Sequence, residues 1–78
     1  MSGTRVLVIG GAGFIGSHLS DVCSDKGCEV FVYDNFSTGK RSFLGKIPPE
    51  NIFEGDILDP AALADATGKA DPEIVFHM

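Results

Sequence analysis

Hydrophobic residues along the chain fall either in short continuous runs or at helical spacing. The runs at residues 6–9 and 30–33 consist of aliphatic, β-branched and aromatic side chains without polar alternation. That pattern is typical of parallel strands covered on both faces. Residues 52–53 predict a short third strand that ends near Asp56, and residues 73–77 predict a fourth strand.

Two segments between these runs have helical periodicity instead. From Phe14 onward, apolar residues recur at i, i+4, i+7 and i+8, which predicts a helix with one apolar stripe (Ile15, Leu19, Val22 and Cys23). Gly27 is placed to stop this helix. A second helix is predicted from Pro60, with Asp59 as its N-cap, to Gly68.

The resulting order is strand, helix, strand, loop, strand, helix, strand. Residues 35–49 hold turn formers and a Pro-Pro pair, which predicts a long loop with one helical turn near residues 42–44. Strands that alternate with helices join as parallel crossover units. We therefore predict an α/β fold: the first half of a Rossmann-type doubly wound sheet, with four parallel strands in the order 3-2-1-4.

The glycine cluster GGAGFIG, residues 10–16, separates the first strand from the first helix. It can be read as G-x-G-x-x-G through Gly11, Gly13 and Gly16, or as G-x-x-G-x-x-G from Gly10 through Gly13 and Gly16. Such glycines allow a sharp turn and a close approach of the backbone to a pyrophosphate, which the N–H groups of the helix start then face. An isolated cluster also fits an ordinary turn, but its place in a crossover unit of about 30 residues favours a dinucleotide site.

Asp34 ends the second strand, 18 residues after Gly16, near the spacing expected for an acid that binds the adenosine ribose. A carboxylate accepts hydrogen bonds from both ribose hydroxyls but repels a 2′-phosphate. No Arg follows directly, and Lys40 and Arg41 are interpreted as a solvated loop face. We therefore predict NAD rather than NADP as the cofactor. The alternative role for Asp34 is a plain loop acid before Asn35.

Asp56 ends the third strand at the same edge of the predicted sheet. Its side chain is placed to accept a hydrogen bond from the adenine amino group, with the Ile57 backbone as a second contact. From spacing alone, an Asx-turn between strand and helix is favoured over this role.

Charge and composition exclude several function classes. With six Lys and Arg against 11 Asp and Glu, the net charge is −5, and the basic stripe of a nucleic-acid-binding protein is missing. No apolar run approaches the roughly 20 residues that span a bilayer, and no signal-peptide pattern is present, so we expect a cytoplasmic protein. Cys23 and Cys28 lack the C-x-x-C spacing or further ligands of a redox or metal site, and we interpret them as reduced packing residues.

Four segments, GGAGFIGSH, VYDNFSTGK, FEGDILDP and VFH, together resemble the extended short-chain dehydrogenase/reductase family. Within it, they are most similar to the NAD-dependent nucleotide-sugar epimerases, dehydratases and decarboxylases. The resemblance covers nearly the whole chain and favours the G-x-x-G-x-x-G reading. It implies that residues 1–78 are a partial NAD(P)-binding Rossmann domain, truncated after the fourth strand. We expect either a fragment or a chain whose apolar edge strand is covered by a partner.

The resemblance also implies the residues of the cofactor site. The family's motifs map onto the pyrophosphate loop, the adenosine ribose acid with its following loop, and the adenine pair (Gly10, Gly13, Phe14, Ile15 and Gly16; Asp34, Asn35, Phe36, Ser37, Thr38 and Gly39; Asp56 and Ile57). His77 falls where the family often reads H-L-A-A, and we expect a packed or hydrogen-bonded residue there. His18 is expected on the helix surface or in packing, and no metal ligands are predicted.

Two departures concern the loop and the end of the chain: Ile9 stands where the family commonly has Thr, and Met78 where Leu is usual. A third concerns catalysis, because the family's Tyr-x-x-x-Lys is absent. The only tyrosine, Tyr33, has Ser37 four residues later and is interpreted as a packing residue. We therefore predict no catalytic residue here and no activity for the chain alone.

The function expected from the resemblance is that of the NAD-binding half of a nucleotide-sugar isomerase or lyase that transiently transfers hydride to NAD. A nucleotide-sugar substrate and a homodimer are expected only for a full-length member. The alternatives are a non-catalytic NAD-binding sensor or structural module and a half-Rossmann unit without cofactor affinity.

Overall fold

The computed structural model describes residues 3–10, 13–36, 44–56 and 58–77, and the structural statements below concern these residues. Its centre is a parallel sheet in the order β3-β2-β1-β4. The strands are β1 (Arg5–Ile9), β2 (Glu29–Asp34), β3 (Ile52–Glu54) and β4 (Ile74–His77). This confirms the predicted Rossmann-type architecture and strand order.

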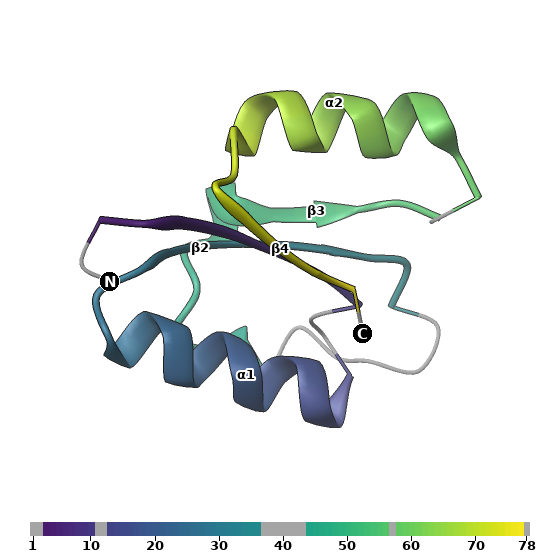
Figure 1. Cartoon of the computed structure of the whole chain (residues 1–78). Helices are drawn as coiled ribbons and strands as arrows, with labels where there is room; N and C mark the ends of the chain where they lie inside the picture. Colours follow the sequence, from purple (N-terminus) through teal and green to yellow (C-terminus); the bar gives the residue numbers. More distant parts are fainter. Residues whose placement is uncertain (1–2, 11–12, 37–43, 57, 78) are drawn as a thin grey trace.

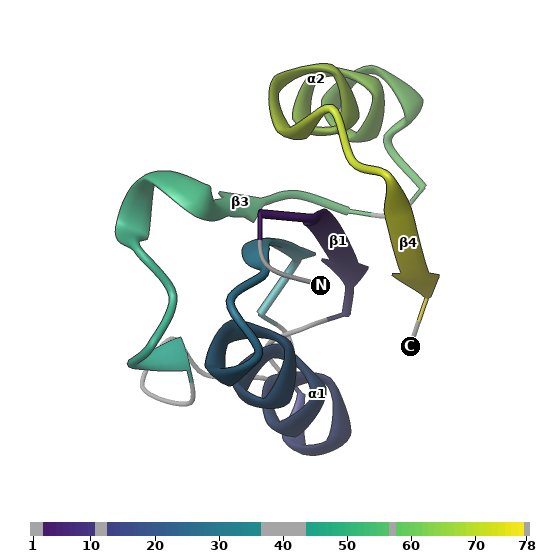
Figure 2. The same ribbon diagram turned by 60° about the vertical axis from the view of Figure 1, so that its left-hand side comes forward.

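The sheet is covered on both faces, which explains why its strands are continuously apolar. Helix α1 (Phe14–Asp25) lies on one face and helix α2 (Pro60–Ala70) on the other (Figures 1 and 2). Alternate residues of β1 point to opposite sides: Val6 and Val8 pack in the cluster beneath α1, whereas Leu7 packs with the buried alanines of α2.

The predicted apolar stripe of α1 is confirmed for Leu19 and Cys23, which pack in or against the cluster beneath the helix, and is wrong for Ile15 and Val22. Ile15 is 68% exposed and Val22 is 37% exposed, whereas small residues face the sheet, among them Ser20, Cys23 and Gly16. Ser20 is fully buried, and its burial is tolerated because its hydroxyl donates a hydrogen bond to the Gly16 carbonyl at 2.8 Å. The buried face of α1 thus combines apolar residues of the predicted stripe with small residues, such as Gly16 and Ser20, that hydrophobic periodicity does not identify.

The end of α1 agrees with the prediction that Gly27 stops it. Gly27 has a φ of 85°, and its N–H donates to the Ser24 carbonyl at 3.0 Å. The Cys28 N–H donates to the Cys23 carbonyl at 3.1 Å, which completes a Schellman motif. Both cysteines are free and buried, as expected of packing residues. Burial, together with the adjacent Cys28 thiol, raises the pKa of Cys23.

Helix α2 begins as predicted but ends later. The Asp59 carboxylate accepts the Ala62 N–H at 3.1 Å, and Pro60 is the first helical residue. The predicted stop at Gly68 is wrong, because the helix continues to Ala70 and is capped by Asp71 at a φ of 45°. Ala70 packs against the sheet, and this contact outweighs the low helix propensity of an exposed glycine.

The long connection between β2 and β3 contributes to the core. Leu44 and Ile47 are buried in the cluster under α1. A short 3₁₀-helix, η2 (Pro49–Asn51), precedes β3 and was not predicted. The predicted helical turn near residues 42–44 lies largely outside the described residues.

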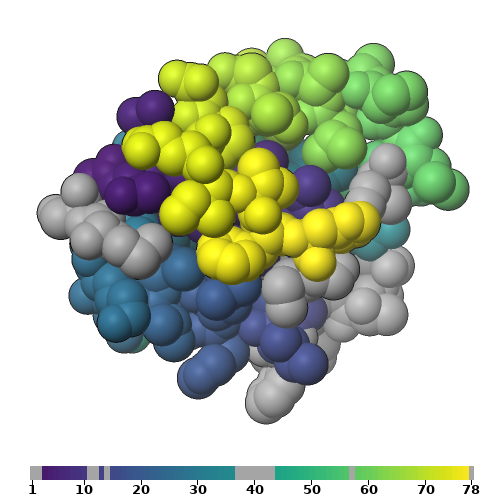
Figure 3. Space-filling model, viewed as in Figure 1, coloured from purple at the N-terminus to yellow at the C-terminus, as the bar shows by residue number. Residues whose placement is uncertain are grey.

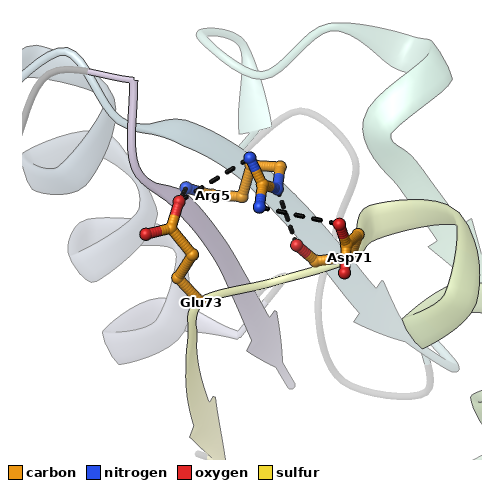
Figure 4. A network of polar contacts seen from close by, with 3 residues as sticks. All are labelled: Arg5, Asp71 and Glu73. Atoms are coloured by element: carbon orange, nitrogen blue, oxygen red, sulfur yellow. Dashed lines mark hydrogen bonds and ion pairs between the residues drawn. The ribbon is translucent and has the colours of Figure 1, made fainter.

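At the amino end of the sheet, the Arg5 side chain contacts the turn that precedes β4. The Arg5 Nε donates to the Asp71 carbonyl at 2.6 Å, and the guanidinium lies 3.6 Å from the Asp71 carboxylate and 3.7 Å from that of Glu73 (Figure 4). These contacts join β1 to the turn between α2 and β4. They place β4 at the edge of the sheet, where it lies on the surface between the two helices (Figure 3).

Candidate functional site

A cleft of about 160 Å³ opens at the carboxyl end of the sheet. Residues from the ends of all four strands line it (Ile9, Gly10, Tyr33, Asp34, Asn35, Gly55 and His77). Ligands of open α/β sheets bind outside the carboxyl ends of the strands, and the cleft occupies that place. The two predicted acids come from the two strands on one side of β1.

The glycine turn leads from β1 over this edge into α1. Gly10 has a φ of 83°, a conformation that favours glycine, and its N–H donates to the Tyr33 carbonyl at 2.7 Å. Gly13 is the N-cap of α1, and no side chain of the described residues caps that helix end. A Cβ added at Gly13 would lie 3.7 Å from the Gly10 carbonyl oxygen, an ordinary contact. The protein itself therefore tolerates a side chain at Gly13.

The first turn of α1 contains the remaining predicted pyrophosphate residues. Phe14 begins the helix, Ile15 is exposed, and Gly16 is buried against the sheet. Backbone N–H groups at a helix start combine with the positive end of the helix dipole to form a site for an anion. Helix α1 starts at the carboxyl end of the strands, as Figure 1 shows, and the residues that line the cleft come from that same end.

Asp34 lies at the rim of the cleft and is half-buried. Its Oδ1 accepts the Phe36 N–H at 2.7 Å, and its backbone carbonyl accepts the Gly55 N–H at 3.0 Å. Asp34 therefore forms a turn with its carboxylate and also lies where a ribose-binding acid is expected. Asn35 is exposed and also lines the cleft.

Phe36 has a φ of 58°, which is unusual for a bulky residue. Its side chain packs, partly buried, against the core cluster beneath α1. The structure thus places Phe36 as the residue that redirects the chain after β2. The predicted site residues Ser37, Thr38, Gly39 and Ile57 lie outside the described residues.

Asp56 is exposed in the turn between β3 and α2. Its Oδ1 accepts the Leu58 N–H at 2.8 Å, which is the Asx-turn that its spacing favoured. Its backbone carbonyl accepts both the Tyr33 hydroxyl at 2.7 Å and the Asp59 N–H at 3.0 Å. The adenine contact remains a prediction for this carboxylate.

Sequence reasoning did not place three cleft-lining residues in the site, namely Ile9, Tyr33 and Gly55, whereas the family resemblance implies that His77 lies at the strand edge near the middle of the cofactor. Each is the last or nearly the last residue of a strand or follows one, and this position at the carboxyl end is the signal that identifies them. Tyr33 is buried, as expected of a packing residue. His77 is exposed in the cleft rather than packed, and His18 lies on the helix surface.

Two kinds of feature are absent from the part of the chain that the structure describes. No group of three or more His, Cys, Asp or Glu side chains there is arranged to hold a metal ion. Neither described helix has the length and hydrophobicity needed to cross a bilayer.

Comparison with known proteins connects this geometry to a family. A sequence model of the NAD dependent epimerase/dehydratase family matches residues 6–78. The UDP-glucose 4-epimerase of Rhizobium leguminosarum bv. trifolii is 46% identical over 99% of the chain, and UDP-glucuronic acid decarboxylase 1 of Arabidopsis thaliana is 42% identical over 76%. The chain spans 23% and 14% of the length of these two relatives.

A solved structure shares the fold closely. The crystal structure of UDP-glucose 4-epimerase from Brucella ovis in complex with NAD superposes with a TM-score of 0.88 at 44% identity. The match covers 96% of this chain and 22% of that one. The similarity thus extends over almost the whole chain and about a quarter of its relative.

Proposed function

Because the chain belongs to the NAD-dependent epimerase/dehydratase family, we propose that it binds the adenosine and pyrophosphate half of NAD at the carboxyl end of its sheet. The single observation that carries this proposal is the cleft, which is formed by the ends of all four strands beside the glycine turn. The neighbouring turn and helix start have the chemistry of a phosphate site.

Each part of the proposed site, in the cleft or beside it, has a separate task in this proposal. The glycine turn and the N–H groups at the start of α1 hold the pyrophosphate. Asp34, at the cleft rim, accepts hydrogen bonds from the adenosine ribose hydroxyls and disfavours a 2′-phosphate. Asp56 and Ile57 meet the adenine. The first two tasks use backbone donors and a carboxylate, so an acidic chain without a basic patch can perform them.

The described part of this chain contributes binding rather than acid–base catalysis. Its one tyrosine, Tyr33, is buried and donates its hydroxyl to the Asp56 carbonyl, so this phenol has no access to a substrate. We propose that the parent enzyme acts on a UDP-sugar as an isomerase or lyase in the cytoplasm, as a homodimer. NAD supplies transient hydride acceptance when bound, and residues beyond this chain perform the proton transfer.

The proposal is tested by calorimetric titration of the chain with NAD and NADP, alongside the same titrations of Asp34→Asn. We expect NAD to bind more tightly than NADP. We also expect Asp34→Asn to lower NAD affinity by about tenfold or more, because hydrogen bonds to a charged acceptor are lost. The preference for NAD over NADP should shrink because the repulsion of the 2′-phosphate is removed.

A matched control is Asp65→Asn, which removes an exposed carboxylate paired with Lys69 on α2, away from the cleft. Its affinities should equal those of the unaltered chain. Tighter binding of NADP than NAD by the unaltered chain would contradict the role of Asp34, and no binding of either would leave a half-Rossmann unit without cofactor affinity. A Tyr-x-x-x-Lys downstream in the gene product would separate the enzyme from a non-catalytic NAD-binding module.

A further inference from the structure

We propose that Tyr33 is a positioning residue for adenine recognition, and that its hydroxyl fixes the Asp56 carboxylate through the Asp56 backbone carbonyl. The inference rests on the proposed function, because it concerns how one part of the proposed NAD site is held. It assigns a role to a residue that sequence reasoning had placed in packing alone.

The first observation is the hydrogen bond itself. Tyr33 is 1% exposed, and its hydroxyl donates to the Asp56 carbonyl at 2.7 Å across 23 positions of sequence. The same carbonyl accepts the Asp59 N–H, and the Asp56 carboxylate accepts the Leu58 N–H. The turn around Asp56 is therefore tied internally by two hydrogen bonds and to the sheet by the Tyr33 hydroxyl.

The second observation is the fit of Gly55 over the tyrosine ring. A Cβ at Gly55 would lie 2.8 Å from the Tyr33 Cζ and 3.0 Å from its Cε1, and it would be closer still to the hydroxyl oxygen. A side chain at position 55 would therefore displace the phenol. Glycine at this position allows the turn to lie directly against the tyrosine.

The third observation is that two consecutive residues of β2 hold two consecutive residues of the turn. The Asp34 carbonyl accepts the Gly55 N–H at 3.0 Å, and the Tyr33 hydroxyl binds the Asp56 carbonyl. The proposed ribose acid and the proposed adenine acid are thus linked through two adjacent contacts. A shift of the turn would change the distance between the two carboxylates that a bound adenosine has to meet.

The phenol remains a donor at neutral pH. Burial, and then the nearby carboxylates of Asp59 and Asp56, raise the pKa of Tyr33 above its ordinary value. A protonated hydroxyl donates to the carbonyl, whereas phenylalanine has the same ring without the donor. Tyr33→Phe therefore removes the hydrogen bond and preserves most of the packing.

The test compares NAD with an analogue in which unsubstituted purine replaces adenine, so that only the amino group is missing. The unaltered chain should bind NAD more tightly than the purine analogue, because Asp56 accepts from the amino group. Tyr33→Phe should reduce this preference by about three- to tenfold, the effect of misplacing one hydrogen-bond acceptor. Its affinity for the purine analogue should fall less than its affinity for NAD, because the analogue lacks the amino group that Asp56 accepts from.

Thr67→Val is the matched control. The Thr67 hydroxyl donates to the Leu63 carbonyl at 2.8 Å within α2, so this variant also removes one hydroxyl-to-carbonyl hydrogen bond. It should lower stability to a similar extent and leave the preference for NAD over the purine analogue unchanged. A purely structural role for Tyr33 would make the two variants behave alike.

The possible failures are distinguishable. If the unaltered chain does not bind NAD, the proposed function fails. If it binds NAD and prefers it to the purine analogue, and Tyr33→Phe keeps that preference, the positioning role is overturned. In an Asp56→Ala background, Tyr33→Phe should have no further effect on the preference. Should Tyr33→Phe not fold, Gly55→Ala tests the same contact, because its Cβ displaces the phenol. Since Gly55 also lines the cleft, only the ratio of the affinities for NAD and the purine analogue is compared, and an unchanged ratio overturns the positioning role.

Discussion

The two ends of the sheet differ in structure: ion pairs cross the amino end, whereas a cleft opens at the carboxyl end. At the amino end, Arg5 reaches from β1 to Asp71 and Glu73, so charged side chains of the chain satisfy one another. At the carboxyl end, the strands stop around an open cleft whose lining includes two glycines, Gly10 and Gly55, beside polar side chains such as Asp34. One end is complete within the chain, whereas the other presents donors and acceptors toward a space of about 160 Å³.

The contrast shows how a parallel sheet divides stability from binding. At the amino end, the long Arg5 side chain joins β1 to the turn that leads into β4. At the carboxyl end, long side chains would fill the space that a ligand needs, so the chain uses glycine and backbone N–H groups instead. Substitutions at the two ends should therefore separate into effects on affinity and effects on stability.

The largest effect is expected from Gly13→Ser at the carboxyl end. Among the described residues, its Cβ would meet the Gly10 carbonyl at 3.7 Å, an ordinary contact. The added hydroxyl can cap α1, which no side chain of the described residues does. The free energy of unfolding should rise by a few tenths of a kcal/mol. NAD affinity should fall by roughly 100-fold, about 2.7 kcal/mol, because the side chain occupies the approach of the pyrophosphate.

Thermal unfolding and calorimetric titration of the same preparations measure both quantities. Gly68→Ala is the matched control, since it adds a side chain at an exposed helical glycine with open space around it. It should stabilise the chain by about 1 kcal/mol and leave NAD affinity unchanged. Undiminished NAD binding by Gly13→Ser would show that the glycine turn is structural only.

The sequence predicts those features of the sheet and its two ends that depend on residues close together in the chain. Continuous apolar runs indicate buried parallel strands, and Asp59 with Pro60 marks the start of α2, as the structure confirms. The glycine turn and Asp34 lie at the edge expected of them. Each of these features depends on residues that are neighbours in sequence or on the general handedness of crossover units.

The features that the sequence does not reveal depend on distances between elements. Hydrophobic periodicity correctly predicts the burial of Leu19 and Cys23 on α1. It also predicts burial of Ile15 and Val22, which are exposed, and it does not identify the buried Ser20, whose hydroxyl is bonded within the helix. The contact between Tyr33 and Asp56 joins positions 23 apart, and it requires the register that pairs Tyr33 with Phe53. Neither periodicity nor a motif encodes such a contact.

A smaller effect is expected from Arg5→Met at the amino end. The substitution keeps the aliphatic stem and removes the hydrogen bond to Asp71 and both ion pairs. Because this side chain is 38% exposed, solvent screens the pairs, and we expect a loss of about 0.5–1 kcal/mol in the free energy of unfolding. NAD affinity should not change.

Lys46→Met provides the control for this variant. Lys46 pairs with Asp25 at 3.0 Å on a more exposed part of the surface, so its removal should have little measurable effect. Urea unfolding gives the stabilities of all three proteins. A weaker NAD affinity in Arg5→Met at unchanged stability would break the proposed division between the two ends.

The smallest effect on the free energy of unfolding is expected at alkaline pH. There the contribution of Tyr33, at the carboxyl end, changes, whereas that of Arg5, at the amino end, does not. The pKa of Tyr33 is raised in the folded chain, mainly by burial, so folding disfavours its ionisation. This contribution is fully present below the ordinary tyrosine pKa of about 10 and is lost as the pH rises through the folded-state value. Tyr33→Phe should therefore reduce the alkaline loss of stability, whereas the Arg5 contacts persist because guanidinium stays charged. Since Tyr33 is the only tyrosine, the ultraviolet absorbance of tyrosinate follows it directly, and an ordinary midpoint in the folded chain would contradict the buried hydrogen bond to Asp56.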